Sequence, residues 1–277
     1  MKIKKSLNVS GKLISLETPV VMGILNITPD SFYQNSRYQS IKEVLKESEK
    51  MLIEGADILD IGGYSSRPGA HEVTIEEEIS RVIPVVEAVT ENFHNAIISV
   101  DTFRSEVANV ALEAGAHIIN DISGGRADAK MYDLIAKWAC PYIVMHMKGT
   151  PQTMMQMTNY EDLLKEIITY FSEIAYLLRA RGVKDIIIDP GFGFAKNMEQ
   201  NYNLLQNLSH LQVLGLPILA GISRKSMIYK KLGITSQEAL NGTTVLNSFA
   251  LMNGASILRV HDVKEAVETV RLFKEIQ

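Results

Sequence analysis

The stretch Ile186-Ile187-Ile188-Asp189-Pro190-Gly191-Phe192-Gly193-Phe194 decides the fold of this chain. Three β-branched apolar residues end abruptly at an acid, and turn residues follow at once. A short apolar run bounded by Pro and Gly is typical of a strand buried within a parallel sheet. The acid then lies at the carboxyl end of the strand, where the chain leaves the core. The same layout recurs along the chain.

Eight apolar segments predict strands, and helical segments separate them: 20–26, 58–61, 97–101, 117–121, 142–146, 186–189, 217–222 and 255–260. This alternation predicts βαβ units and a parallel sheet. We expect a closed (β/α)8 barrel, the TIM barrel, as a single domain over residues 1–277, with 1–17 as a peripheral N-terminal segment. A doubly wound open sheet is the alternative, because counting strands does not distinguish the two.

The helical segments carry start and stop signals. The patterns at 40–43, 74–77 and 262–265 are those of capping boxes, in which a polar side chain accepts from a backbone N–H three residues later. Gly55 is expected to end the first helix. These signals place each helix after a strand, as a barrel requires.

Composition excludes several classes of protein. The chain has 277 residues, with 46% hydrophobic and 22% charged residues, and a net charge of −4 that gives no field to attract nucleic acid. No apolar run approaches the roughly 20 residues that a membrane helix needs. Cys140 is the single cysteine, which excludes an internal disulfide and suits a reducing compartment. We therefore expect a cytoplasmic protein without a membrane or nucleic-acid partner.

Polar side chains gather at the predicted strand ends: Asn26, Asp60, Asp101, Asn120, Asp121, His146, Asp189, Lys225, Arg259 and His261. Any single Asp of this set is explained by helix capping, and a lone His146 by a satisfied core contact. In a barrel, however, all of these ends open on one face, where active sites lie. The set as a whole therefore predicts a polar site.

The chemistry of these residues favours a planar heterocycle with an anionic group. Asp101, Asn120 and Asp189 suit the guanidine-like edge of a pterin, which a carboxylate binds at two points. Arg67, Lys225, Arg259 and His261, with the run 223–226 at a helix start, indicate an anion site. The chain has no phosphate-binding glycine loop, no Cys/His cluster and no serine-nucleophile motif.

The chain closely resembles the dihydropteroate synthase family of the folate pathway. The matching segments span almost the whole sequence, in order: 22–32, 60–63, 65–69, 99–102, 119–122, 145–151, 189–194, 223–226 and 259–262. Two segments differ from the usual pattern. Tyr33-Gln34-Asn35-Ser36 replaces Ser-Asp-Gly-Gly, and Tyr64 and Ser66 stand where Glu and Thr are commoner.

The resemblance implies a transferase, usually a homodimer, that condenses 6-hydroxymethyl-7,8-dihydropterin diphosphate with 4-aminobenzoate. The products are 7,8-dihydropteroate and diphosphate, and sulfonamides mimic the aminobenzoate. By this resemblance, the pterin diphosphate is held by Asn26, Ser66, Asp101, Asn120, Met145, Asp189, Lys225, Arg259 and His261. The 4-aminobenzoate site is formed by Phe32, Arg67, Pro68, Phe194 and Ser226. Asp101, Asp189, Lys225 and Arg259 are the expected catalytic residues, and Asn26 the Mg²⁺ ligand.

Two other functions stay open at the level of sequence. A pterin-binding methyltransferase would share the barrel and its Asp/Asn pocket, but would not need the basic groups at 223–226 and 259–261. A non-catalytic pterin-binding barrel would keep the pocket without the chemistry, and the altered segment 33–36 is the feature that favours it.

Overall fold

A ring of eight parallel strands forms the centre of the computed structural model, which describes residues 3–27, 37–64, 73–150 and 152–276. Strands β3 to β8 pair in chain order, and β10 pairs with both β3 and β9. A parallel bridge between Ile188 and Ile218 closes the ring, so the barrel is confirmed and the open sheet is wrong. The strands are β3 (Val20–Asn26), β4 (Ile58–Gly62), β5 (Ile97–Asp101), β6 (Ile118–Asp121), β7 (Tyr142–Met145), β8 (Ile186–Asp189), β9 (Leu219–Ala220) and β10 (Ile257–Val260).

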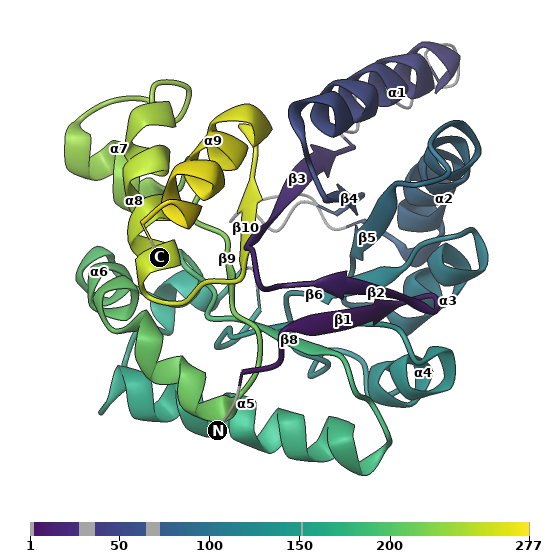
Figure 1. Cartoon of the computed structure of the whole chain (residues 1–277). Coiled ribbons are helices and arrows are strands. Elements are labelled where there is room, and N and C mark those ends of the chain that lie inside the picture. Colours follow the sequence, from purple (N-terminus) through teal and green to yellow (C-terminus); the bar gives the residue numbers. More distant parts are fainter. Residues whose placement is uncertain (1–2, 28–36, 65–72, 151, 277) are drawn as a thin grey trace.

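Helices surround the ring (Figure 1). They are α1 (Arg37–Glu54), α2 (Ile75–Asn92), α3 (Ser105–Glu113), α4 (Met131–Trp138), α5 (Leu163–Ala180), α6 (Met198–Gln206), α7 (Ser226–Leu232), α8 (Leu240–Met252) and α9 (Val263–Lys274), with short 3₁₀ helices η2 (Met154–Gln156) and η3 (Leu208–Leu214). Among the described residues, none of the helices is long and apolar enough to span a membrane.

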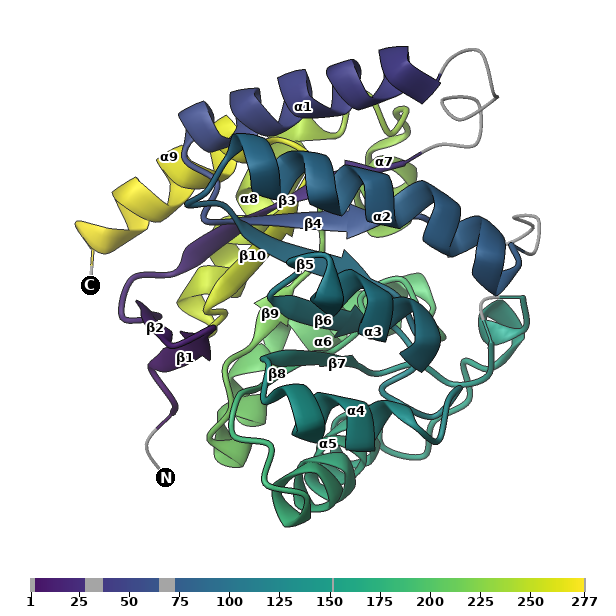
Figure 2. The ribbon, with the colours of Figure 1, turned by 90° about the vertical axis from the view of Figure 1, so that its right-hand side faces the viewer.

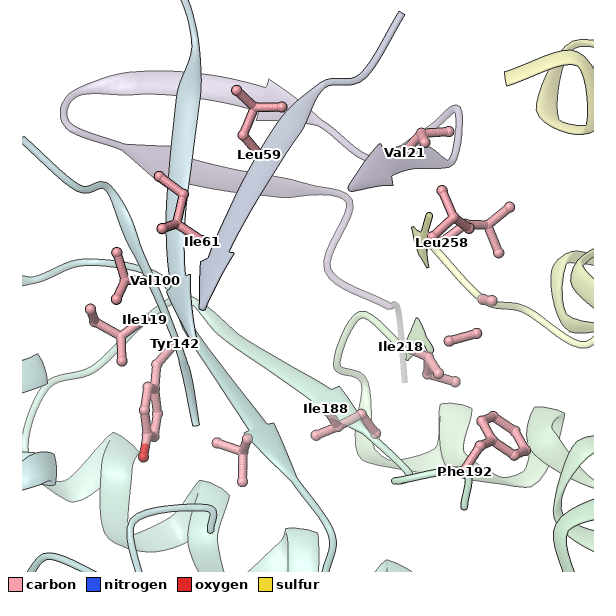
Figure 3. Close-up of a cluster of buried hydrophobic side chains, with 14 of the residues drawn as sticks. Val21, Leu59, Ile61, Val100, Ile119, Tyr142, Ile188, Phe192, Ile218 and Leu258 are labelled. Atoms are coloured by element: carbon pink, nitrogen blue, oxygen red, sulfur yellow. The ribbon is translucent and has the colours of Figure 1, made fainter. Parts of the chain in front are cut away.

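Side chains alternate between the two faces of each strand, and this alternation divides the core into two layers. Outward-facing residues such as Leu59, Ile61 and Ile188 pack against the helices, and Figure 3 labels these three within that layer. Inward-facing residues such as Ile58 and Ile187 form a second cluster inside the barrel. Both layers are buried and stabilise the barrel by the hydrophobic effect.

A hairpin closes the amino end of the barrel. Strands β1 (Ser6–Val9) and β2 (Lys12–Ser15) pair antiparallel around Gly11. Leu7, Val9 and Leu16 are buried in the same cluster as the inward-facing strand residues. The segment 1–17, expected to be peripheral, therefore contributes side chains to the core. In Figure 2 the hairpin lies at the left, where the strands begin, and β4 points to the right, toward the opposite end of the barrel.

Most predicted strand boundaries agree with the structure within two residues, and two elements differ more. Thr74 caps α2 as expected, since its hydroxyl accepts from the backbone N–H of Glu77 at 3.2 Å. The first helix, however, begins at Arg37, so the predicted cap at Ser40 is wrong. The strand predicted at 217–222 is reduced to the two residues of β9, because the chain touches β8 only through the bridge at Ile218.

Candidate active site

The polar mouth of the barrel follows from the same alternation that builds its core. Inward positions near the strand starts are apolar, and the inward positions that follow toward the carboxyl ends are mostly polar. In each of five strands the second residue lies two positions after the first, on the same face: Ile58 and Asp60, Ile118 and Asn120, Ile143 and Met145, Ile187 and Asp189, and Ile257 and Arg259. The predicted residues therefore meet at one end of the barrel.

Arg259 ties two carboxylates together across the mouth. Its Nε donates to Asp60 Oδ2 at 2.6 Å, and its Nη2 donates to Asp101 Oδ2 at 2.8 Å. The amide of Asn120 also donates to Asp60 Oδ2, at 3.1 Å. Asp60 is fully buried, whereas Asp101 and Arg259 keep about a fifth of their side chains exposed. The network therefore fixes Asp101 and Arg259 while leaving both accessible to a ligand.

The carboxyl group of Asp101 titrates near neutral pH. Burial raises its pKa to about 7, against the attraction of Arg259 and with added repulsion from Asp60. Attraction by Asp60 and Asp101 outweighs the effect of burial on Arg259, whose pKa is raised, so the guanidinium stays charged. A ligand that donates N–H groups would favour the carboxylate form of Asp101.

Asp189 and Lys225 bring a second pair of opposite charges to the mouth, since a Cβ on Gly221 would lie 3.7 Å from Asp189 Oδ2 and 4.0 Å from Lys225 Nζ. Asp189 Oδ1 accepts from the backbone N–H of Gly191 at 2.8 Å. The amine of Lys225 donates to the carbonyl of Phe192 and lies 4.6 Å from the centre of the Phe194 ring. Burial raises the pKa of Asp189 and lowers that of Lys225 to about 8, and in each case the partner's charge opposes the effect.

An apolar wall stands beside these charges. Met145, 3% exposed, packs with Ile122, Met147 and Met154, and the half-buried Phe194 lies against this cluster. Ile122 and Met147 also line an open cavity of about 1050 Å³ that extends away from the charged residues described above, toward α5, and none of those charged residues lines it. Apolar walls with a few convergent polar groups are typical of sites for flat heterocyclic ligands.

Fewer residues of the run 223–226 face the anion side of the mouth than the sequence predicts. His261 Nδ1 lies 3.0 Å from the hydroxyl of Ser223, which also accepts from the backbone N–H of His261. Arg224 turns away, since its guanidinium donates to both carboxylate oxygens of Asp262 at 2.8 and 2.7 Å. Its predicted place in the anion site is therefore wrong, and so is the predicted cap by Asp262, which holds Arg224 and makes no side-chain cap bond to α9. Ser226, at the start of α7, directly follows Lys225.

The candidate oxygen donors for a hard divalent cation are Asn26 Oδ1, at the end of β3, and the carboxylate of Asp101, at the end of β5. A Cβ on Gly62 would lie 3.9 Å from both Asn26 Oδ1 and Asp101 Oδ2, so the glycine separates these two oxygens. Within the described ranges, no cluster of three or more His, Cys, Asp or Glu side chains could hold a metal ion. Such sparse oxygen donors fit an ion like Mg²⁺, which keeps much of its shell for water and phosphate oxygens.

Several predicted residues do not join this group. Asp121 accepts from the backbone N–H groups of Ser123 and Gly125 and from the hydroxyl of Tyr142, so it shapes a loop. His146 is 2% exposed and packs in the core. Four further predicted residues lie outside the described residues: Phe32, Ser66, Arg67 and Pro68.

Two residues had no individual function assigned to them by the sequence prediction. Asp60 was one of the predicted strand-end residues. Nothing in the sequence around it, however, indicated that it binds both Arg259 and Asn120. Lys196 follows the motif at 189–194, and the structure buries its amine at 2% exposure beneath that loop.

Comparison with known proteins gives a consistent result. Residues 22–261 match the family model described as pterin binding enzyme. The Dihydropteroate synthase of Escherichia coli (strain K12) is 43% identical over 266 residues, which cover 95% of this chain and 94% of that protein. The crystal structure of the Yersinia pestis dihydropteroate synthase with a sulfonamide drug complex has a TM-score of 0.91 and 41% identity, covering 98% of both chains. The Xanthomonas albilineans dihydropteroate synthase in complex with 7,8-dihydropteroate has a TM-score of 0.87 and 33% identity, covering 99% of both.

Proposed function

The chain belongs to the pterin-binding enzyme family and, within it, to the dihydropteroate synthases; from this premise we propose how its residues carry out the reaction. The substrates are 6-hydroxymethyl-7,8-dihydropterin diphosphate and 4-aminobenzoate, and the products are 7,8-dihydropteroate and diphosphate. The observation that carries the proposal is that two carboxylates and two basic groups meet in one mouth: Asp101 is bonded to Arg259, and Asp189 lies near Lys225.

The carboxylates and the amide bind the pterin. Asp101, Asn120 and Asp189 accept or donate hydrogen bonds along the polar edge of the ring, and Met145 packs against its face. Arg259 lies against the ring and, with His261 and Asn26, contacts the diphosphate. A bound Mg²⁺, held by Asn26 and the diphosphate oxygens, would supply charge neutralisation at the leaving group.

The reaction is proposed to be a dissociative substitution. The bond between the pterin methylene carbon and the diphosphate oxygen breaks first, and the electron-rich ring shares the positive charge that develops. Asp101 and Asp189 stabilise this charge, while Lys225, Arg259 and His261 stabilise the departing diphosphate. The amine of 4-aminobenzoate then forms the new carbon–nitrogen bond and releases a proton. An aromatic amine is already nucleophilic, so no general base is assigned.

The aminobenzoate half of the site is proposed to lie around Phe194 and Ser226, with Phe32, Arg67 and Pro68 completing it by resemblance and Ser66 contacting the diphosphate. The Yersinia pestis relative was solved with a sulfonamide drug, and we extend sulfonamide binding to this chain. The groups at Lys225 and His261 weigh against a methyltransferase, which has no diphosphate to bind.

The test is diphosphate release by the purified protein, with pterin diphosphate, 4-aminobenzoate and Mg²⁺ omitted one at a time. The synthase requires all three for rapid release and gives dihydropteroate as product. Absence of turnover, with pterin diphosphate still bound in calorimetry, would instead assign a non-catalytic pterin-binding protein. Turnover that needs no added divalent metal, in buffer treated with a chelator, would remove Mg²⁺ from the proposal.

We also propose that the protein is a homodimer in the cytoplasm. Val245, Phe249 and Met252 are exposed at spacings of four and three residues on α8, which places three apolar side chains on one helix face. A second copy of the chain is the proposed occupant of this face. Light scattering on the wild type and on Phe249→Asp tests it, because a charge at the centre of the face should give monomers.

A further inference from the structure

Lys196 is a buried lysine whose three donors are all used. Its amine lies 3.1 Å from each of three acceptors: the carbonyls of Gly191 and Phe194, and Nδ1 of His146. A lysine is rarely buried unless its charge is compensated, and an ammonium has three N–H groups to place. Its contacts join the end of β7 to the loop after β8, and only 2% of Lys196 is exposed.

The loop that Lys196 holds has an unusual backbone. Gly191, Gly193 and Ala195 have φ of +70°, +81° and +49°, which alanine rarely adopts. A Cβ on Gly191 would lie 2.2 Å from the carbonyl oxygen of His146, so only glycine fits there. A conformation of this kind persists only where its surroundings fix it.

Hydrogen bonds fix the loop from two sides. On the mouth side, Lys225 donates to the carbonyl of Phe192. On the core side, Lys196 donates to the two carbonyls described above, and Asn201 accepts from the backbone N–H of Gly193 at 2.7 Å. Further along, the hydroxyl of Tyr160 donates to the carbonyl of Ala195 at 2.9 Å. Lys196 contacts both ends of the turn from residue 191 to residue 194, in addition to the turn's own bond from Phe194 N–H to the carbonyl of Gly191 at 3.1 Å.

The charge of Lys196 is compatible with this role near neutral pH. Burial lowers the pKa of Lys196 to about 7, against the attraction of Asp189 and with repulsion from Lys225 and Lys148. Burial and the charge of Lys196 lower the pKa of His146 to about 2, so its imidazole is neutral. A neutral imidazole carries its proton on either nitrogen, so it can accept from the ammonium or donate to the free amine. The contact therefore survives either state.

We propose that Lys196 is a positioning residue of the synthase, which holds the turn from residue 191 to residue 194 so that the Phe194 ring forms the aminobenzoate half of the site. This inference rests on the proposed function. The backbone of Asp189 is held from outside this turn, since its carbonyl accepts from His146 N–H at 2.9 Å. Loss of the Lys196 contacts should therefore affect aminobenzoate more than pterin.

The decisive variant is Lys196→Met, which keeps the length of the side chain but removes its donors. We expect the KM for 4-aminobenzoate to rise about tenfold and kcat to fall about tenfold, because a displaced ring misaligns the amine. The Kd for pterin diphosphate, measured by calorimetry, should change less than about threefold. Lys196→Gln keeps N–H donors without the charge, so its KM should lie between those of the wild type and the Met variant. Lys137→Met, at an exposed site on α4, is the matched control.

The outcomes separate this inference from the function on which it rests. A wild type that forms no dihydropteroate defeats the proposed function whatever the variants do. An active wild type with an unchanged KM in Lys196→Met overturns only the role of Lys196, as does an equal rise in KM and in the pterin Kd. Where Lys196→Met fails to fold, Lys196→Gln carries the same comparison: a raised KM with an unchanged Kd supports positioning, and an unchanged KM overturns it.

Discussion

The two ends of the barrel are built from the same strands but are used in opposite ways. At the amino end, inward side chains such as Ile58 and Ile187 pack under Leu7 of the hairpin. Two residues further along the same strands, Asp60 and Asp189 bring buried charge to the carboxyl end. Burial stabilises the first set, whereas it disfavours the ionised form of Asp189, whose pKa is raised. Stability is thus concentrated at one end and ligand chemistry at the other.

The largest expected effect is at the mouth. Asp189→Asn removes the charge but leaves an oxygen that can accept from the backbone N–H of Gly191, so the loop should keep its shape. We expect kcat/KM for dihydropteroate formation to fall roughly 1,000-fold, since preorganised charge is lost where positive charge develops. Steady-state kinetics measures the loss, and thermal unfolding checks that the melting temperature is maintained. Near-normal turnover in this variant would refute the assigned role of Asp189.

The opposite result is expected at the amino end. Leu7 is fully buried in the cluster that closes the barrel, and Leu7→Ala leaves a cavity there. We expect the free energy of unfolding to fall by about 3 kcal/mol. The kcat/KM of the folded protein should stay within about twofold of the wild type, because the hairpin is remote from the mouth. Denaturant unfolding and kinetics on the same sample test both statements, and a large fall in kcat/KM would show that the two ends are coupled.

The pH dependence of substrate capture tests the mouth alone. Below about pH 7 the carboxyl group of Asp101 takes up a proton and loses its attraction for N–H donors. Above about pH 8 Lys225 loses its charge. The kcat/KM for pterin diphosphate should therefore pass through a maximum between these values, falling by up to about tenfold per pH unit on the acid side.

The matched control is Asp101→Asn. This variant is less active, but the diphosphate of its substrate titrates as it does with the wild type. Its acid limb should be flatter than that of the wild type. Identical acid limbs in the two proteins would assign the titration to the diphosphate of the substrate instead of Asp101. Arg259 and Asp60 face Asp101 in both proteins, so their charges are common to the comparison.

The sequence predicts the barrel well because its signals are local. An apolar run and the acid that ends it lie within a few residues of each other, as in 186–189, so strand position and direction can be read directly. The residues Asp101 and Asp189 are predicted for the same reason, since the closed ring brings all strand ends together. Motif matches over nearly the whole chain add the assignment of roles.

What the sequence does not predict depends on partners that are distant in the chain. Asp60 binds Arg259, which lies 199 residues away, and Lys196 binds His146, 50 residues away. Asp262 has the same local cap pattern as Thr74, but a distant arginine takes its carboxylate instead. Competition between a local and a distant partner is settled only by the folded geometry.

The smallest effect is expected at a charge on the amino end. Lys4 lies 2.7 Å from a carboxylate oxygen of Asp185, and its amine also donates to the carbonyl of Lys184. The lysine is about one-third exposed, so solvent screens the pair, and Lys4→Met should lower the free energy of unfolding by less than about 1 kcal/mol. The same substitution at Lys196 changes the aminobenzoate KM in our proposal, whereas here kcat and both KM values should be unchanged. Urea unfolding at low and at high salt measures the effect, which should shrink as salt rises. A fall in the free energy of unfolding as large as that of Leu7→Ala would mean that this ion pair stabilises the amino end as much as apolar packing does.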